Sequence, residues 1–329
     1  MARARGADRR QAERRAASSS EPGAVVVTGV CGRMGRRLAR QLHRERLVIG
    51  LDRRPFDDRP KDIEHHPIDI RRKKARELFR RKNISALIHL GVMHDPRGNS
   101  EEHHTWNVVA FQKLLDYVQL HQIPKLVLLS SANVYGPRPD NAQFLSEDAP
   151  LLGAGTFSDI RDLIELDMLA QSFFWKNPRT ETVILRPANI LGTVRNAPSN
   201  YLRLKVVPTL MGFDPMVQVV HQDDVVRAVQ LALRPGVRGI FNIAGPPPVA
   251  LSGALKLLKR PTVPVPYSMA KRGVARLWRW RMTSFPAPEL EFIRYVCMVD
   301  DRRAREILGY EPAFDLAATL ASVDEERWI

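Results

Sequence analysis

Cysteine is scarce in this chain, which has only Cys31 and Cys297 among its 329 residues. Two cysteines cannot build the disulfide framework of a small secreted protein, so the reducing cytoplasm is the expected location. Apolar runs of about 18 residues are also missing, so no membrane-spanning helix is expected. The first residues lack the apolar core of a signal peptide, and the chain has no internal repeats.

Acidic residues are outnumbered, and the formal net charge is +15. Residues 1–22 hold six arginines against three acids and end in serines and a proline, which predicts a disordered basic tail. Residues 71–82 hold eight basic residues and one acid around a narrow apolar stripe of Ala75, Leu78 and Phe79. This second run is typical of the solvent face of a surface helix.

A third basic segment, residues 269–282, contains Trp278 and Trp280. A basic amphipathic segment with tryptophans can lie on an anionic membrane surface. The alternative, a helix of a small lobe with its tryptophans packed inward, is the favoured interpretation. Nucleic acid is not an expected partner because no nucleic-acid-binding motif accompanies the charge.

Short apolar strands alternate with amphipathic helices in the first two thirds of the chain. This alternation predicts an α/β fold with a Rossmann-type, doubly wound parallel sheet. The expected strands are 25–27, 48–51, 86–90, 125–129 and 182–185, and the expected helices are 33–46, 72–82, 101–121 and 157–175. We expect a Rossmann domain over 23–190 and a mixed substrate lobe over 191–329, with 219–245 returning to the Rossmann sheet.

A glycine turn joins the first strand to the first helix. Gly29, Gly32 and Gly35 have G-x-x-G-x-x-G spacing after three valines. Glycine is needed where a side chain would block the phosphates of a dinucleotide or the close packing of strand and helix. The N–H groups at the helix start attract a pyrophosphate, so the turn predicts a dinucleotide site.

The second expected strand ends in Asp52, where a carboxylate would hold the ribose hydroxyls of NAD. Arg53 and Arg54 follow at once, and Arg33 and Arg37 lie nearby in sequence. These arginines could instead accept the 2′-phosphate of NADP. NAD is the expected cofactor, with NADP as the alternative.

Nine motifs in order resemble those of the extended short-chain dehydrogenases/reductases, of the NAD-dependent epimerase/dehydratase family. The resemblance runs from about residue 24 to residue 312. The motifs are residues 28–35, 69–70, 87–91, 107–108, 128–136, 185–192, 219–225, 241–245 and 308–312.

The resemblance implies roles for individual residues. The implied cofactor-binding residues are Gly29, Gly32, Arg33, Met34, Gly35, Asp52, Arg53, Asp69, Ile70, Leu90, Gly91, Val92, Arg161 and Pro187. The implied substrate-binding residues are Ser131, Ala132, Asn133, Asn189 and Arg195. Ser131 is also the expected catalytic serine.

The catalytic pair departs from the family pattern. Such proteins carry a tyrosine and, four residues later, a lysine that lowers the pKa of the tyrosine. Here those positions hold Phe157 and Arg161. Phenylalanine has no proton to exchange, and arginine keeps its charge near neutral pH. Either another group, with His94 as the first candidate, supplies the proton, or the protein binds dinucleotide without turnover.

Three functional hypotheses follow. The leading one is an NAD(P)-dependent oxidoreductase or epimerase acting on a hydroxyl or keto group, with a nucleotide-sugar as the candidate substrate. The alternatives are a non-catalytic dinucleotide-binding sensor and a dehydrogenase of sterol or lipid hydroxyls. A small-molecule substrate is the expected partner, a homodimer is common in such families, and the histidine pairs lack the spacing of a metal site.

Overall fold

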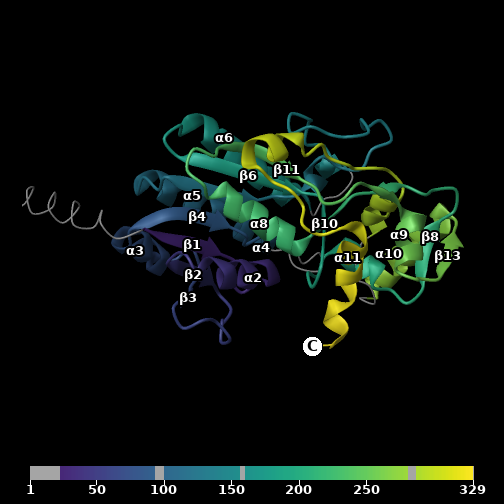
Figure 1. Cartoon of the computed structure of the whole chain (residues 1–329), viewed down its shortest axis with the longest axis horizontal. Helices are drawn as coiled ribbons and strands as arrows, with labels where there is room; N and C mark the ends of the chain where they lie inside the picture. The colour runs from purple at the N-terminus through teal and green to yellow at the C-terminus, as the bar shows by residue number, and fades with distance from the viewer. Residues whose placement is uncertain (1–22, 93–99, 156–159, 281–286, 329) are drawn as a thin grey trace, which may run out of the picture.

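The structure of this chain is a computed structural model that describes residues 23–92, 100–155, 160–280 and 287–328. Its centre is a seven-stranded sheet in the order β11-β6-β5-β4-β1-β2-β3 (Figure 1), and every neighbouring pair is parallel. The strands are β1 (Ala24–Thr28), β2 (Val48–Asp52), β3 (Glu64–Pro67), β4 (Ile84–His89), β5 (Lys125–Leu129), β6 (Glu181–Pro187) and β11 (Gly239–Ile243). The predicted doubly wound parallel sheet is confirmed.

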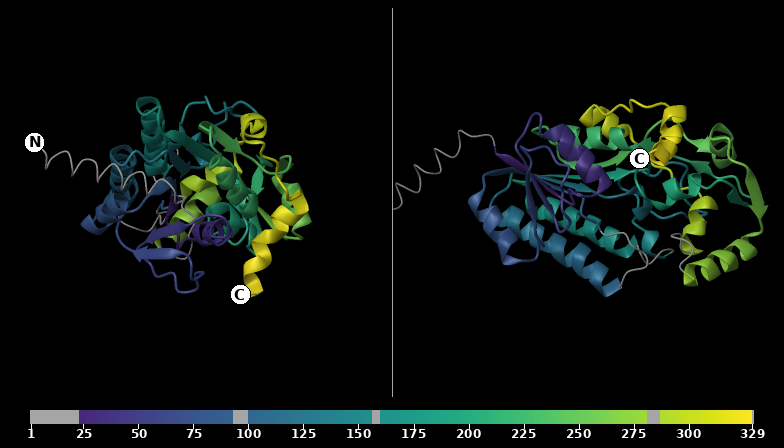
Figure 2. Two further views of the ribbon diagram at one scale, coloured as in Figure 1. Left: turned by 60° about the vertical axis from the view of Figure 1, so that its left-hand side comes forward. Right: turned by 90° about the horizontal axis from the view of Figure 1, so that it is seen from below.

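Helices cover both faces of the sheet. One face packs against α2 (Arg33–Leu42) and α8 (Gln222–Ala232), and the other against α3 (Lys73–Arg81), α5 (Ala110–Leu120) and α6 (Arg161–Lys176). The view from below in Figure 2 shows the sheet between purple α2 and blue α5. Along β1, Val25 and Val27 enter one apolar core, whereas Ala24 and Val26 enter the other. This alternation explains why nearly every residue of the strand is apolar.

Two elements differ from the sequence expectation. The short edge strand β3 was not expected because Glu64, His65 and His66 give no apolar pattern. The expected helix over 101–121 is three pieces: α4 (Ser100–His104), a π-helical turn η1 (Thr105–Val109) and α5. The basic helix α3 agrees with its prediction, since Ala75, Leu78 and Phe79 are its buried residues.

The later part of the chain builds a smaller lobe around a third apolar cluster. β11 joins the edge of the central sheet, whereas β10 (Val219–His221) pairs with β7 (Asn189–Leu191) apart from it. The remaining elements are α7 (Ala197–Leu202), β8 (Val207–Leu210), β9 (Met216–Val217), β12 (Val249–Ala250), α9 (Leu251–Leu257), β13 (Thr262–Val265), α10 (Tyr267–Arg279), η5 (Ala287–Ile293), η6 (Ala304–Leu308), α11 (Leu316–Ala321) and η7 (Ser322–Trp328).

The favoured interpretation of the third basic segment is wrong in one respect. Helix α10 forms there, but none of its residues is buried, and Trp280 is more than half exposed. The expected basic tail, residues 1–22, lies outside the described residues. Within the described part of the chain, no helix is long and apolar enough to cross a membrane.

Candidate active site

The predicted glycine turn is held by backbone packing at the carboxyl ends of β1 and β4. Gly29 has a left-handed φ of +72°, and a Cβ on it would lie 2.6 Å from the Gly91 Cα. A Cβ on Gly35 would lie 2.3 Å from the Gly29 carbonyl oxygen. A side chain at either position would therefore push strand, turn and helix apart. The glycines leave a backbone cradle of the kind that a pyrophosphate needs.

Helix α2 begins directly after this cradle. Its N-cap, Gly32, has no side chain to accept the first N–H groups of the helix. The N–H groups at a helix start carry the positive end of the helix dipole and suit an anion. Met34 packs against the core, and Arg33 points across to the smaller lobe, where its guanidinium donates to the Thr193 carbonyl.

Asp52 is fixed at the end of β2. Its Oδ2 accepts the Cys31 N–H at 3.1 Å and an N–H of the Arg54 guanidinium at 3.1 Å. Its Oδ1 accepts the backbone N–H and Nε of Arg54. Burial favours a raised pKa, but the hydrogen bonds from Arg54 and Cys31 outweigh it and hold the Asp52 pKa below its usual value. The carboxylate is therefore ionised, as a ribose acceptor must be, while Arg54 balances its charge.

A second acidic group, Asp69, lies after β3. It pairs with Arg71, whose Nη2 is 2.8 Å from Oδ2, and the neighbouring Ile70 packs against the core. The guanidinium carbons of Arg53 and Arg71 lie 3.4 and 4.0 Å from the centre of the Trp106 ring. These cation–π contacts tie the end of β2, the start of α3 and the π-helical turn together. Sequence reasoning missed Trp106, which carries no motif of its own.

The end of β4 is built on a buried histidine. His89 is 1% exposed, its Nδ1 lies 2.6 Å from the Thr28 Oγ1, and its ring stacks on Phe111. Burial lowers the pKa of His89 to about 4, so its imidazole is neutral. The strand passes from here into Leu90, Gly91 and Val92, and the Leu90 N–H donates to the Thr28 carbonyl at 3.2 Å.

Ser131 begins the short 3₁₀ turn η2 (Ala132–Val134) after β5. Its Oγ accepts the Asn133 N–H at 3.2 Å, which fixes the oxygen. Among the described residues, no acceptor is paired with the Ser131 O–H. The hydroxyl can therefore donate to a ligand oxygen, as expected of a serine at this position.

An apolar cavity of about 80 Å³ opens beside η2. The two predicted substrate residues Asn133 and Asn189 both line it, and the Asn189 amide donates to the Gln218 carbonyl at 3.1 Å. The other lining residues are Ala197, Pro198, Tyr201, Leu202, Val217, Val219, Leu251, Phe292 and Ile293. Arg195, the other predicted substrate residue beyond η2, is exposed and does not line this cavity.

A buried polar network lies behind Ser131. Arg186 makes a two-pronged ion pair with Asp167, with contacts of 2.7 and 2.9 Å, and both side chains are at most 1% exposed. Ser130 donates to Asp167 at 2.7 Å. Arg186 also donates to the Tyr135 hydroxyl, which in turn donates to Asn242. This network of hydrogen bonds connects β5, α6, β6 and β11 beneath Ser131.

The Tyr135 hydroxyl is used in this structural network. It is 1% exposed, and burial raises its pKa to about 12. It therefore does not replace the missing tyrosine as an acid or base. Sequence reasoning also missed Asp167, although a carboxylate on the apolar face of a helix indicates a buried cationic partner.

Helix α6 starts at Arg161, whose side chain is exposed. The next residue, Asp162, accepts from the buried Asn107 amide at 3.0 Å, so α6 is tied to η1. Phe157 and His94 lie outside the described residues. Pro187, the remaining predicted cofactor residue, ends β6 and is buried.

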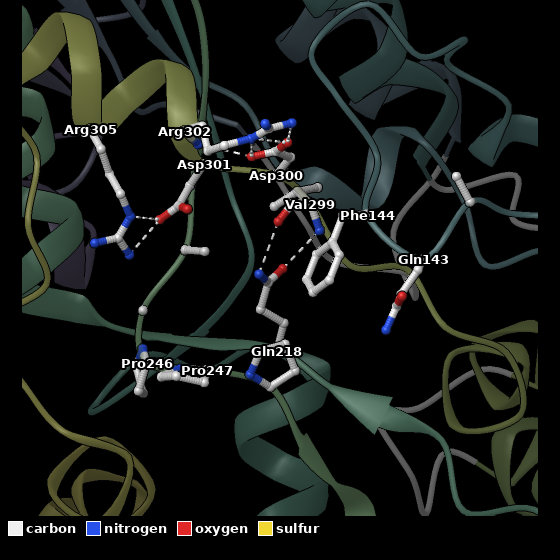
Figure 3. Close-up of a pocket in the computed structure, with 14 residues that line it drawn as sticks. Gln143, Phe144, Gln218, Pro246, Pro247, Val299, Asp300, Asp301, Arg302 and Arg305 are labelled. Atoms are coloured by element: carbon white, nitrogen blue, oxygen red, sulfur yellow. Dashed lines mark hydrogen bonds and ion pairs between the residues drawn. The ribbon is translucent and has the colours of Figure 1, made fainter.

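A larger cavity of about 550 Å³ lies on the other side of Gln218 (Figure 3). Its charged groups are paired with one another: Arg302 with Asp300 and Arg305 with Asp301. Gln218 exchanges two hydrogen bonds with the Val299 backbone and forms part of the wall. Because Val217 and Val219 face the apolar cavity, the segment around Gln218 separates the two cavities. Among the described residues, no three acidic, histidine or cysteine side chains gather as a metal site would require.

Solved structures of nucleotide-sugar enzymes share this fold. MoeE5 in complex with UDP-glucuronic acid and NAD superposes with a TM-score of 0.69 and 23% identity, covering 93% of this chain and 99% of that one. The UDP-glucose 4-epimerase with UDP-glucose from Thermotoga maritima superposes with a TM-score of 0.70 and 18% identity, with the same coverage of 93% and 99%.

Two sequence relatives match the chain over different lengths. An uncharacterized protein of Mycobacterium tuberculosis is 28% identical over 306 residues, which cover 88% of this chain and 80% of the relative. A UDP-glucose 4-epimerase of Dictyostelium discoideum is 26% identical over 175 residues, half of each protein. Residues 25–244 match the family described as "NAD dependent epimerase/dehydratase family". This match spans most of the chain and agrees with the glycine cradle and the parallel sheet, so the chain belongs to the NAD-dependent epimerase/dehydratase family.

Proposed function

We propose that this protein is an NAD-dependent oxidoreductase or epimerase that acts at a carbon bearing a hydroxyl or keto group. The observation that carries the proposal is the cradle of Gly29, Gly35 and Gly91 at the start of α2, with the ionised Asp52 at the end of the next strand. Because backbone atoms already occupy the place of a Cβ at Gly29 and Gly35, strand, turn and helix lie close together, and the start of α2 meets the turn without intervening side chains. NAD fits this cradle, with Asp52 on its ribose and the α2 N-terminus on its pyrophosphate.

When bound, the nicotinamide supplies a hydride acceptor or donor. The Asn133 N–H donates to the Ser131 Oγ, which supports the proposal that the Ser131 hydroxyl donates to the oxygen of the reacting carbon. Arg161 keeps its charge and can orient a ribose diol, but it does not act as a proton reservoir near neutral pH. The proton must therefore come from another group, for which we propose His94.

The substrate class has two candidates. A nucleotide-sugar is supported by the ligands of the structural neighbours MoeE5 and the Thermotoga epimerase. A compound with an apolar body and a hydroxyl is supported by the cavity beside η2, in which Asn133 and Asn189 are the polar side chains apart from the Tyr201 hydroxyl. That hydroxyl donates to the Pro208 carbonyl at 2.8 Å, so the wall is apolar apart from the two asparagines.

The first experiment is a titration of the full chain with NAD, NADH, NADP and NADPH. Turnover is then followed by nicotinamide absorbance and by product analysis, with nucleotide-sugars and apolar hydroxy compounds offered separately. NAD binding with product formation supports the enzyme and identifies the class. NAD binding without any product supports the alternative of a non-catalytic sensor, and absence of dinucleotide binding contradicts the proposal.

The proton donor is tested in the same assay. If His94 acts as the acid or base, His94→Ala abolishes turnover while NAD still binds; retained turnover rules His94 out. The double variant Phe157→Tyr with Arg161→Lys restores the family pair. If the protein is a sensor, the double variant should bind NAD with nearly the same affinity as the parent protein, and the parent protein should convert no substrate.

A further inference from the structure

Helix α10 presents an apolar stripe to solvent. Met269, Gly273, Leu277 and Trp280 follow one another at spacings of four, four and three residues, which places them on one side of the helix. Met269 is 60% exposed, Leu277 39% and Trp280 56%, and nothing lies within 4 Å of a Cβ built on Gly273. Single exposed apolar residues are ordinary, but a stripe at helical spacing is an unpartnered face.

The opposite side of α10 explains this orientation. Tyr267 is hydrogen-bonded to Glu291, and the Arg294 guanidinium carbon lies 4.5 Å from the centre of the Tyr267 ring. Val274 and Trp278, which follow Tyr267 at helical spacing, are half-buried. The helix is therefore fixed to η5 through one face, so its apolar stripe points away from the lobe.

Basic residues flank the stripe. Within its 13 residues α10 carries Lys271, Arg272, Arg276 and Arg279 and no acid. The Arg276 guanidinium carbon lies 4.7 Å from the centre of the Trp280 ring. The helix lies at the end of the molecule remote from β3 (Figures 1 and 2), so a flat surface can reach it.

We propose that this face of α10 docks on an anionic lipid surface. Arginines beside an exposed tryptophan, leucine and methionine match the headgroup layer, where phosphates meet the cations and the acyl boundary accepts the apolar stripe. A second copy of this chain is disfavoured because each carries a net charge of +15. A nucleic acid would neutralise the arginines but leave the apolar stripe in water. The proposal goes beyond the catalytic activity and does not depend on it.

The test is flotation of the full chain with vesicles of phosphatidylcholine alone or mixed with phosphatidylglycerol. We expect binding to the anionic vesicles only. The triple variant Arg272→Gln, Arg276→Gln, Arg279→Gln should weaken binding at least about tenfold. The matched control Lys73→Gln, Lys74→Gln, Arg76→Gln removes the same charge from α3 and should leave binding within about twofold.

A second pair of variants tests the apolar stripe. Leu277→Ser with Trp280→Ser should abolish flotation, whereas Trp175→Ser, which removes a 78% exposed tryptophan from α6, should not. Circular dichroism checks that each variant is folded. The proposal is overturned if the protein does not bind anionic vesicles, or if both charge variants lose binding equally. It is also overturned if duplex DNA prevents all vesicle binding and binds the serine variant as well as it binds the parent protein.

Discussion

At the scale of single residues, Asp52 and His89 illustrate how neighbours set the charge of a side chain near the proposed cofactor site. Asp52 is ionised because Arg54 and the Cys31 N–H stabilise its carboxylate. His89 is neutral because burial disfavours the charged form of its imidazole. The two residues lead to separate predictions, one for cofactor choice and one for stability.

Asp52→Asn should shift the choice between cofactors. The carboxylate repels a ribose 2′-phosphate, and its loss leaves the Arg54 guanidinium without its anionic partner. We expect the ratio of the NADP to the NAD dissociation constant to fall by about tenfold or more, as measured by fluorescence titration. Asp58→Asn is the control. It removes a carboxylate that pairs with arginines of α2, and it should leave the ratio unchanged. An unchanged ratio in Asp52→Asn would show that Asp52 does not face the ribose.

His89 should make the free energy of unfolding depend on pH. Its pKa is about 4 when folded and 6.5 when unfolded, so between these values the unfolded state binds the extra proton. The stabilisation is complete above pH 6.5 and is lost as the pH falls towards 4, in total about 3 kcal/mol. Urea unfolding at pH 7 and pH 4.5 should show a smaller fall for His89→Asn than for the parent protein. Equal falls in the two proteins would contradict the prediction.

At the scale of elements, the turn between β1 and α2 depends on missing side chains. Gly35→Ala should destabilise the protein and abolish dinucleotide binding, because its Cβ would collide with the Gly29 carbonyl. Gly273→Ala is the matched control in α10, where the space is open, and should stabilise the protein by about 0.5–1 kcal/mol. Thermal unfolding and NAD titration measure both effects. A Gly35→Ala protein that binds NAD normally would show that the turn is only a packing device.

The ion pair between α6 and β6 gives a second prediction at this scale. Asp167→Asn leaves the Arg186 charge buried without its partner and should cost about 3–5 kcal/mol in urea unfolding. Asp140→Asn breaks an exposed pair with Arg138 and should change stability little. Comparable losses from both substitutions would mean that the buried network contributes no more than a surface pair.

At the scale of the whole molecule, we expect binding of the proposed cofactor to be coupled to folding. If NAD binds the folded chain alone, NAD at about 100 times its dissociation constant should add about 2.7 kcal/mol to the free energy of unfolding. Differential scanning fluorimetry should therefore show a higher Tm with NAD, and Gly35→Ala should remove the effect. An unchanged Tm at saturating NAD would argue against the cradle as a cofactor site.

The sequence predicted the central sheet because its strands are apolar on both faces, as in Val25 to Val27. The family resemblance also implied substrate contacts for Asn133 and Asn189, which are far apart in sequence; the two line one cavity, and their contact with a substrate stays a prediction. β3 was not predicted because it is an edge strand, which has a neighbouring strand on one side only, and because its residues are polar. The cation–π cluster at Trp106 depends on three segments meeting in space, which local patterns do not encode.

The polar composition of β3 has a consequence for solubility. The strand is at the margin of the sheet, and its outward backbone groups could pair with a strand from another molecule. It is only four residues long, ends in Pro67, and carries Glu64 bound to Lys82 at 2.8 Å. A proline and an ion-paired charge make a strand a poor template for pairing with an added strand. This edge of the sheet therefore resists the edge-to-edge association that leads to amyloid-like aggregates.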